Sequence, residues 1–209
     1  LCPKPNDLLQ AFNDLKGRIK LGALVISIAA GVPIQAIMDG LDCRHVVRCM
    51  PNTPGSIGAG ITGWTAKGIS DQHRDCVRQI LQALGEEIFF EKEEYLDVVT
   101  GVSGTGTAYA FIFMEAQVAA AVREGLSHAD ARKLVVHTVE GAAKLAMASS
   151  KHLAELRDQV TSPGGTTAAA LHEMEKGRFR TVISNAIRAA CERSRELGRM
   201  LIEKLRKKD

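Results

Sequence analysis

Residues 158–171, DQVTSPGGTTAAAL, hold the side chains best placed to do chemistry. A hydroxyl residue, a proline and two glycines lead into an alanine-rich helix, so Ser162 can cap the helix and Pro163 suits its first turn. Bare backbone amides at the positive end of a helix dipole attract an anion such as a carboxylate, and two threonine hydroxyls there could hydrogen-bond a neighbouring ring nitrogen. From the residues alone, an ordinary capped helix start after a flexible loop is equally well supported. The candidate binding residues are Ser162, Gly164, Gly165, Thr166 and Thr167.

A second glycine-rich stretch, VSGTGTAY at residues 102–109, resembles a dinucleotide-binding loop only superficially. That fingerprint needs a third glycine, and Tyr109 stands in its place. We therefore reject the stretch as a phosphate site. We expect its small residues to let the backbone pass close to another chain or to the edge of a ligand, and Tyr109 to be a core residue rather than a catalytic acid.

Two predicted strand ends are candidate walls of a cofactor site. One apolar run, ALVISIAA at residues 23–30, stops at Gly31, and another at residues 46–50 stops at the sequence Pro-Asn-Thr-Pro. Ligands of open α/β sheets bind beyond the carboxyl ends of the strands. Taken singly, each end is equally well explained as a plain turn.

The remaining reactive side chains form no recognisable catalytic or metal-binding set. The six histidines pair with no cysteine or carboxylate as a triad would, and the five cysteines lack the spacing of metal ligands. We expect no metal and reduced, mostly buried thiols. Glu115 interrupts an apolar stretch, so we expect it to be buried and to hydrogen-bond another helix rather than to transfer a proton.

These candidates must be held by two kinds of structure. Short apolar runs alternate with helical patterns as far as residue 95, which is typical of a parallel sheet with crossover helices. From there on, long helical patterns dominate, and the boundary lies near residues 94–100. The fold class is α/β followed by all-α. We expect strands near 23–30, 46–50, 57–65 and 86–90, and helices near 8–19, 34–41, 71–84, 108–124, 129–149 and 179–207.

The helical part has more apolar surface than one chain of this size can bury. The pattern at 108–124 is apolar or small nearly all round, which is typical of a helix surrounded by other helices. The pattern at 179–207 repeats apolar residues at steps of three and four. We therefore expect an obligate homodimer with an interlocked helical interface.

Composition narrows the function further. The net charge of +3 over 209 residues, with no basic stripe interleaved with aromatics, argues against nucleic-acid binding. The sequence contains no apolar run of membrane-spanning length and no signal segment, so we expect a cytoplasmic protein without a membrane partner. The first residues, Leu-Cys-Pro-Lys-Pro, suit a strand end better than the start of a domain, and we expect a segment upstream of them.

Four segments together resemble the pyrroline-5-carboxylate reductase family, and the likeness runs in order along essentially the whole chain. They are VISIAAGVP at 25–33, RCMPNTPGSIGAG at 48–60, VSGTGTAYAFIFMEA at 102–116 and LRDQVTSPGGTTAAALHEMEKGRFR at 156–180. The block DQVTSPGGTT is the most specific of them. The resemblance favours the anion-site interpretation of this block over a plain helix start.

The resemblance implies reduction of 1-pyrroline-5-carboxylate to L-proline, the last step of proline biosynthesis, with NADPH or NADH as hydride donor. It implies that residues 1–95 are the C-terminal half of a Rossmann-type NAD(P)-binding domain, and that residues 96–209 are a helical domain for substrate binding and dimerisation. The resemblance also implies a homodimer, or a decamer of five dimers. Thr167 would act on the ring nitrogen as the catalytic residue, and Ser162, Gly164, Gly165 and Thr166 would hold the carboxylate. The cofactor side would be formed by Lys4, Pro5, Ala29, Ala30, Met50, Pro51 and Asn52.

Three departures from the family pattern leave alternatives open. We find neither the strand with its glycine-rich diphosphate turn nor the loop that selects between NADPH and NADH, and Thr105 and Thr107 replace the usual serine and proline. The second hypothesis is therefore a non-catalytic remnant that keeps the dimer scaffold and a small-carboxylate site. A different β-hydroxyacid-type dehydrogenase is disfavoured, because residues 108–123 hold no lysine to serve as its catalytic group.

Overall fold

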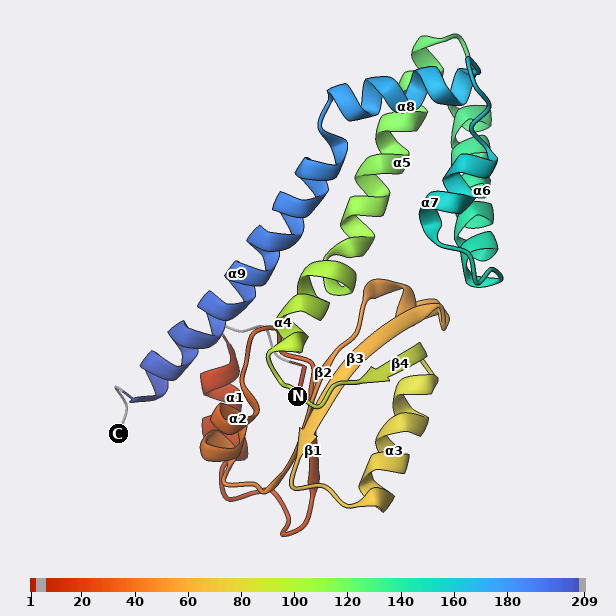
Figure 1. The fold of residues 1–209 in the computed structure, drawn as a ribbon. Helices are drawn as coiled ribbons and strands as arrows, with labels where there is room; N and C mark the ends of the chain where they lie inside the picture. The colour runs from red at the N-terminus through yellow and green to blue at the C-terminus, as the bar shows by residue number, and fades with distance from the viewer. Residues whose placement is uncertain (3–6, 207–209) are drawn as a thin grey trace. The chain divides into compact units, whose positions relative to one another are not determined.

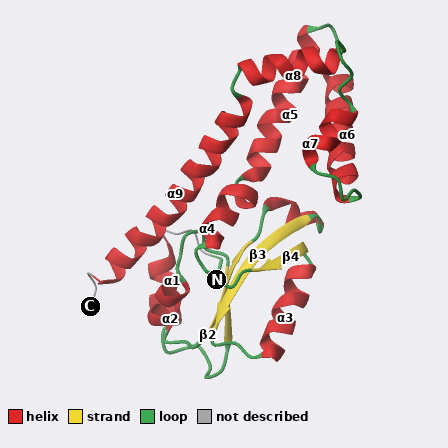
Figure 2. Cartoon of the chain, viewed as in Figure 1, coloured by secondary structure: helices red, strands yellow, loops and turns green. Residues whose placement is uncertain are grey.

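The computed structural model describes residues 1–2 and 7–206. The chain forms two compact units, one made of residues 1–107 and 185–209 and the other of residues 108–184. The first unit contains the sheet, and the second is helical (Figures 1 and 2). The predicted class, α/β followed by all-α, is confirmed. The boundary that we predict between residues 95 and 96 stays a prediction.

The sheet of the first unit has four strands in the order β1-β2-β3-β4. They are β1 (Leu24–Ser27), β2 (His45–Met50), β3 (Gly60–Lys67) and β4 (Gly85–Phe89). The pairs β1–β2 and β3–β4 are parallel, as predicted, but β2 and β3 are antiparallel, so the sheet is mostly and not wholly parallel. The reason is the short connection through the 3-10 turn η2 (Thr53–Ile57), since a parallel crossover needs a dozen or more residues.

Helices cover both faces of this sheet. On one face, α1 (Leu8–Leu15) and α2 (Ile34–Leu41) form a core with Val46 of β2 and Leu201 of α9 (Phe179–Arg206). On the other, α3 (Asp71–Gln82) packs through Val77 against Val47 and Trp64. Because side chains alternate along a strand, the neighbours Val46 and Val47 point to opposite faces of the sheet and belong to different cores. Residues beyond 15 are not in α1, so the predicted helix at 8–19 is shorter than expected.

Two short elements follow β4 in the first unit. Helix α4 (Tyr95–Val99) runs directly into a π-helical turn, η3 (Thr100–Gly104), and α5 (Gly106–Arg123) starts after it. The backbone amide of Thr105 bonds the Thr100 carbonyl at 2.9 Å, which is the five-residue step of a π-turn. Such turns occur mostly as single insertions in α-helices, frequently at functional sites.

In its described residues the second unit contains α-helices and no strands, and few residues of these helices are buried within one chain. Besides most of α5 and the start of α9, it holds α6 (His128–Met147), α7 (Leu153–Gln159) and α8 (Thr166–Lys176). Ser127 caps α6 as predicted, because its hydroxyl accepts the Asp130 amide. Of these helices, α6 buries Ala131 and Val135, whereas no residue of α5, α7 or α8 is fully buried. None of the helices described here is both long and apolar enough to cross a membrane.

Candidate active site

The turn between α7 and α8 presents backbone amides at the start of a helix. Gly164 has a φ of +70°, a left-handed conformation that favours glycine. Gly165 is the N-cap of α8, and no side chain among the described residues caps that end. An α-helix cannot satisfy its own first amides, so those of Thr166, Thr167 and Ala168 lie at this end without an intrahelical acceptor. The arrangement suits a small anion at the positive end of the α8 dipole.

Ser162 does not cap α8, contrary to our prediction. The helix begins at Thr166, so Pro163 lies in the preceding turn and not in the first helical turn. Two glycines lengthen the turn and move the cap position to Gly165. The Ser162 carbonyl instead accepts the Gly165 amide at 3.1 Å, and the exposed Ser162 hydroxyl lies against Gly165, where a β-carbon would collide with it. A hydroxyl therefore stands beside the bare helix start.

The same turn is anchored to α7 on its other side. The Thr161 hydroxyl donates to the carbonyl of Arg157 at 2.7 Å, and the Thr161 amide donates to the carbonyl of Asp158 at 3.0 Å. These bonds attach the turn to the last residues of α7. The predicted binding residues Ser162, Gly164 and Gly165 thus lie in a turn anchored to α7, and Thr166 and Thr167 are the first two residues of α8.

The predicted cofactor residues of the first unit lie at two adjoining strand ends. Parallel pairing sets Ser27 of β1 beside Arg48 of β2, so the segments after both strands start at the same edge of the sheet. Ala30 and the residues 50–52 are half-buried there. Ala29 is different, because the whole residue is only 4% exposed and belongs to the core. Lys4 and Pro5 lie outside the described residues.

Asn52 and Met50 are both held by contacts inside the first unit. The Asn52 side-chain oxygen accepts the Ile61 amide at 3.0 Å, which ties the loop after β2 to β3. Gly104 leaves room for Met50, since a β-carbon on Gly104 would lie 2.5 Å from the Met50 methyl carbon. Gly101 in turn makes room for Cys191 of α9. Gly104 of the 102–109 stretch therefore lies against a side chain of the same chain, and the expected close approach of another chain or a ligand edge stays a prediction.

A buried ionic network in the first unit escaped the sequence analysis. The Arg48 side chain, only 5% exposed, donates to Glu93 and to Asp97, each at 3.0 Å. The same Glu93 oxygen accepts the Ile34 amide at 2.7 Å, and the same Asp97 oxygen accepts the Ser194 hydroxyl at 2.7 Å. The available signal was a charged residue at an inner position of the apolar strand HVVRCM.

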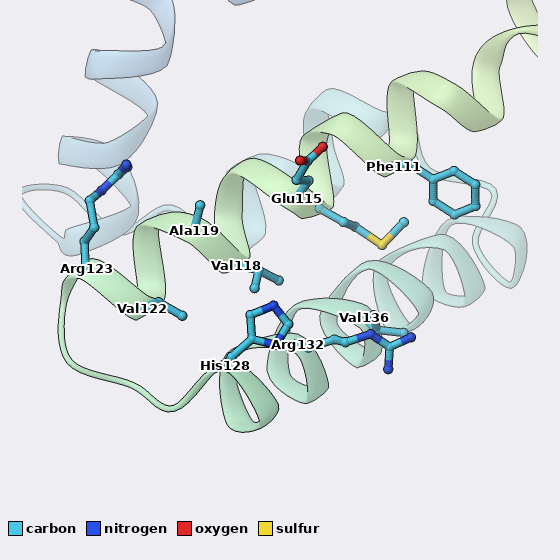
Figure 3. Close-up of a pocket in the computed structure, with 10 residues that line it drawn as sticks. Phe111, Glu115, Val118, Ala119, Val122, Arg123, His128, Arg132 and Val136 are labelled. Carbon is cyan, nitrogen blue, oxygen red and sulfur yellow. The ribbon is translucent and has the colours of Figure 1, made fainter.

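Two expectations about α5 are wrong. Tyr109 is half-buried rather than a core residue, and Glu115 is exposed. The reason is that no residue of α5 is fully buried by the other described residues. Glu115 instead lies at the rim of an apolar hollow of about 830 Å³ between α5 and α6 (Figure 3). The side chains that line this hollow include Phe111, Val118, Val122, His128, Arg132 and Val136.

The described residues fit the nicotinamide side of a dinucleotide better than its diphosphate. Small and amide residues stand at adjoining strand ends, as that side requires. The glycine spacing of the diphosphate fingerprint occurs once in the described part, at Gly58, Gly60 and Gly63, but these residues lead into β3 and not into a helix. Their amides are therefore not at a helix start. No group of three or more potential metal ligands occurs among the described residues.

Comparison with known proteins decides the family. Residues 93–197 match the family described as "Pyrroline-5-carboxylate reductase dimerisation". The pyrroline-5-carboxylate reductase of Synechocystis is 42% identical over 200 residues, which are 95% of this chain and 74% of that protein. The chain belongs to the pyrroline-5-carboxylate reductase family. The enzyme of Methanosarcina acetivorans, 39% identical over 95% of this chain and 74% of its own length, agrees.

Solved structures of the pyrroline-5-carboxylate reductase family share the fold. A Plasmodium falciparum pyrroline carboxylate reductase with NADP bound has a TM-score of 0.89 at 32% identity, over 94% of this chain and 79% of that one. A Coxiella burnetii pyrroline-5-carboxylate reductase has a TM-score of 0.84 at 36% identity, over 93% of this chain and 73% of that one. The roles of individual residues in the α7–α8 turn and at the strand ends remain predictions.

Proposed function

We propose that this protein reduces 1-pyrroline-5-carboxylate to L-proline, with NADPH or NADH as the hydride donor. The observation that carries the proposal is the start of α8, where Gly164 at φ +70° and the uncapped Gly165 leave backbone amides for a carboxylate. Membership of the family supports the reaction class. The NADP bound to the Plasmodium falciparum relative makes NADPH the first donor to test.

The chain's own residues would bind and orient the substrate. The amides of Thr166, Thr167 and Ala168 would hold the carboxylate, and the Ser162 hydroxyl adds a donor beside them. The Thr167 hydroxyl reaches the ring nitrogen, where it accepts the N–H of the protonated imine and keeps its carbon electrophilic. When bound, a reduced nicotinamide would supply the hydride that converts the C=N bond of the protonated imine into the C–N bond of proline. Orientation of two bound molecules lowers the barrier without a metal or a nucleophile.

On the cofactor side, Ala30, Met50, Pro51 and Asn52 would line the nicotinamide, with the buried Ala29 directly before Ala30. Their place at the adjoining ends of parallel strands supports this assignment. Lys4 and Pro5 would extend the same wall.

A homodimer is the second part of the proposal. The exposed apolar residues of the second unit support it: Phe111 is 62% exposed, Ile112 66% and Leu134 58%, and the hollow of Figure 3 has Val118, Val122 and Val136 in its lining. A patch of this kind marks an interaction surface. The match to a dimerisation family over residues 93–197 supports a second copy of the chain as the partner. Sedimentation separates this dimer from a decamer of five dimers by mass.

Paired substitutions at Thr167 test the site. Thr167→Val removes the hydroxyl at nearly constant volume, and Thr167→Ser keeps it. We expect Thr167→Val to lower kcat by about 10²-fold, as for loss of a hydrogen bond to a charged group, and Thr167→Ser to stay within about threefold of the parent. Equal turnover in the parent and Thr167→Val would remove Thr167 from the mechanism.

A further inference from the structure

The two strand ends proposed as the cofactor wall are joined by one carboxylate. Glu93 Oε1 accepts the Ile34 amide at 2.7 Å and the Arg48 guanidinium at 3.0 Å. Ile34 begins α2, directly after the turn that follows β1, and Arg48 stands two residues before Met50 in β2. Pro33, the N-cap of α2, makes no side-chain cap, so Glu93 supplies the acceptor that this helix start lacks, from 59 residues away.

The opposite end of the same turn is held by α9. A β-carbon on Gly31 would clash with the Ser194 carbonyl oxygen, so the backbone of the turn lies directly against that helix. The Ser194 hydroxyl donates to Asp97 at 2.7 Å, and Asp97 accepts the second nitrogen of Arg48 at 3.0 Å. The contacts form a closed ring that runs from Gly31 through Ser194, Asp97, Arg48 and Glu93 to Ile34. Each strand end is therefore fixed relative to the other.

Stability alone is a weak reason for such a network. Burying the charges of Arg48 and Asp97 is costly, and apolar side chains of similar volume are often as stable. The planar Arg48 guanidinium fixes the directions of its hydrogen bonds, because two of its nitrogens donate to two carboxylates at once. A ring of this kind is suited to holding a geometry.

We propose that Arg48, Glu93 and Asp97 are positioning residues that hold the two strand ends at the separation a nicotinamide needs. The role rests on the proposed function as far as the cofactor is concerned. Its structural half, that the network immobilises residues 29–34 and 50–52, stands on the contacts alone. The network contacts the two strand ends through Ile34 and Arg48 and not through the proposed ligand-facing residues, so none of the three residues is assigned to the reacting atoms.

The test compares Glu93→Ala with Glu93→Gln and with the control Glu87→Ala. Glu87 is also a partly buried carboxylate, 15% exposed, and it serves Arg78 at 3.6 Å and the indole nitrogen of Trp64. It sits in β4, and its loss should destabilise the first unit without touching the ring. The Gln variant keeps an oxygen for the Ile34 amide and loses the charge that Arg48 requires.

The first measurement is amide hydrogen exchange of peptides that cover residues 29–35 and 49–53, well below the unfolding temperature. We expect Glu93→Ala to speed exchange in both segments by about tenfold or more, as for loss of a hydrogen bond to a charged group, with Glu93→Gln in between. Glu87→Ala should leave both segments unchanged. Unchanged exchange in Glu93→Ala, or equal acceleration in Glu87→Ala, overturns the positioning role.

The second measurement is steady-state kinetics on the same variants. Glu93→Ala should raise the KM for NADPH by about tenfold while the KM for 1-pyrroline-5-carboxylate changes less than about twofold, because the network borders only one of the two binding regions. An unchanged KM for NADPH overturns the cofactor half of the proposal. Lack of turnover in the parent protein overturns the proposed function itself, and hydrogen exchange then still decides whether the ring holds the strand ends.

Discussion

Gly198 of α9 touches Gly31 of the β1–α2 turn through bare backbone: a β-carbon on Gly198 would clash with the Gly31 carbonyl oxygen. Helix α9 and the turn thus approach each other closely where two glycines meet. We expect Gly198→Ala to lower the free energy of unfolding by about 1–3 kcal/mol, the usual cost of overpacking, in spite of alanine's better helix propensity. Urea unfolding measures it.

The control for that substitution is Gly106→Ala at the start of α5. No atom of the described chain, apart from its neighbours and its own helix, lies within 4 Å of a β-carbon at Gly106. This variant should be as stable as the parent or gain up to about 1 kcal/mol. A Gly198→Ala variant as stable as Gly106→Ala would show that α9 does not approach the turn so closely.

Gly164→Ala tests the turn before α8. Its φ of +70° is strained for alanine, so the substitution should cost about 1–2 kcal/mol of stability and shift the amides that follow. Gly17→Ala is the matched control, because Gly17 has a φ of +74° and open space around it in the first unit. We expect the KM for 1-pyrroline-5-carboxylate to rise about tenfold or more in Gly164→Ala and less than about twofold in Gly17→Ala. Equal KM values in the two variants would place the carboxylate elsewhere.

The thiol of Cys49 should make stability fall in alkaline solution. Burial raises its pKa from 9.0 to about 12, so the folded protein keeps a proton that the unfolded chain loses. The unfolded state then binds fewer protons between those two pKa values, and stability falls as pH rises, by up to about 1.4 kcal/mol per pH unit. The parent should therefore show a steeper loss of unfolding free energy above pH ~9 than Cys49→Ala. Parallel pH profiles would contradict a buried, neutral thiol.

Alkylation offers an independent check on the same burial. Cys2 and Cys76 are exposed, whereas Cys43, Cys49 and Cys191 are buried. Only thiolates react, so iodoacetamide at mildly alkaline pH should modify the two exposed cysteines of the folded protein and reach the other three after unfolding.

Ile112→Asp tests the proposed dimer. Ile112 is 66% exposed in one chain, and a carboxylate there would be buried without a partner if a second copy covers it. We expect the dimer dissociation constant, measured by analytical ultracentrifugation, to rise about 10²-fold or more. Leu21→Asp in the first unit is the control, because Leu21 is fully exposed, and this variant should sediment like the parent. A parent protein that stays monomeric at every concentration would refute the dimer.

Local patterns predicted much of the fold, because local rules decide it. Apolar periodicity located α2, β2, α3 and α9 to within a few residues, and the hydroxyl of Ser127 gave the start of α6. The predicted N-cap of α8, Ser162, was wrong. The N-cap is Gly165, and the conformation of the two glycines, which the sequence pattern does not encode, sets where the helix begins. The antiparallel pairing of β2 with β3 follows from the short connection, which the apolar pattern does not encode.

Long-range partners were the part that could not be predicted. Arg48 meets Glu93 and Asp97 across 45 and 49 residues, and Asp97 meets Ser194 across 97. The residue types suggest that a buried arginine needs a carboxylate, but the chain offers many. The prediction for Glu115 was wrong for a related reason, since the apolar pattern of α5 predicts a buried helix, and none of its residues is buried among the described residues.

The most direct test of the account is transfer of deuterium from NADPH that carries it at the reactive ring carbon. Purified protein is incubated with this donor and 1-pyrroline-5-carboxylate, and proline is examined by mass spectrometry. The account predicts L-proline with one deuterium on the ring carbon next to nitrogen that does not bear the carboxylate, and the same label from NADH if that donor is also used. A folded dimer that binds L-proline but transfers no label from either donor would contradict the reductase and leave a carboxylate-binding scaffold.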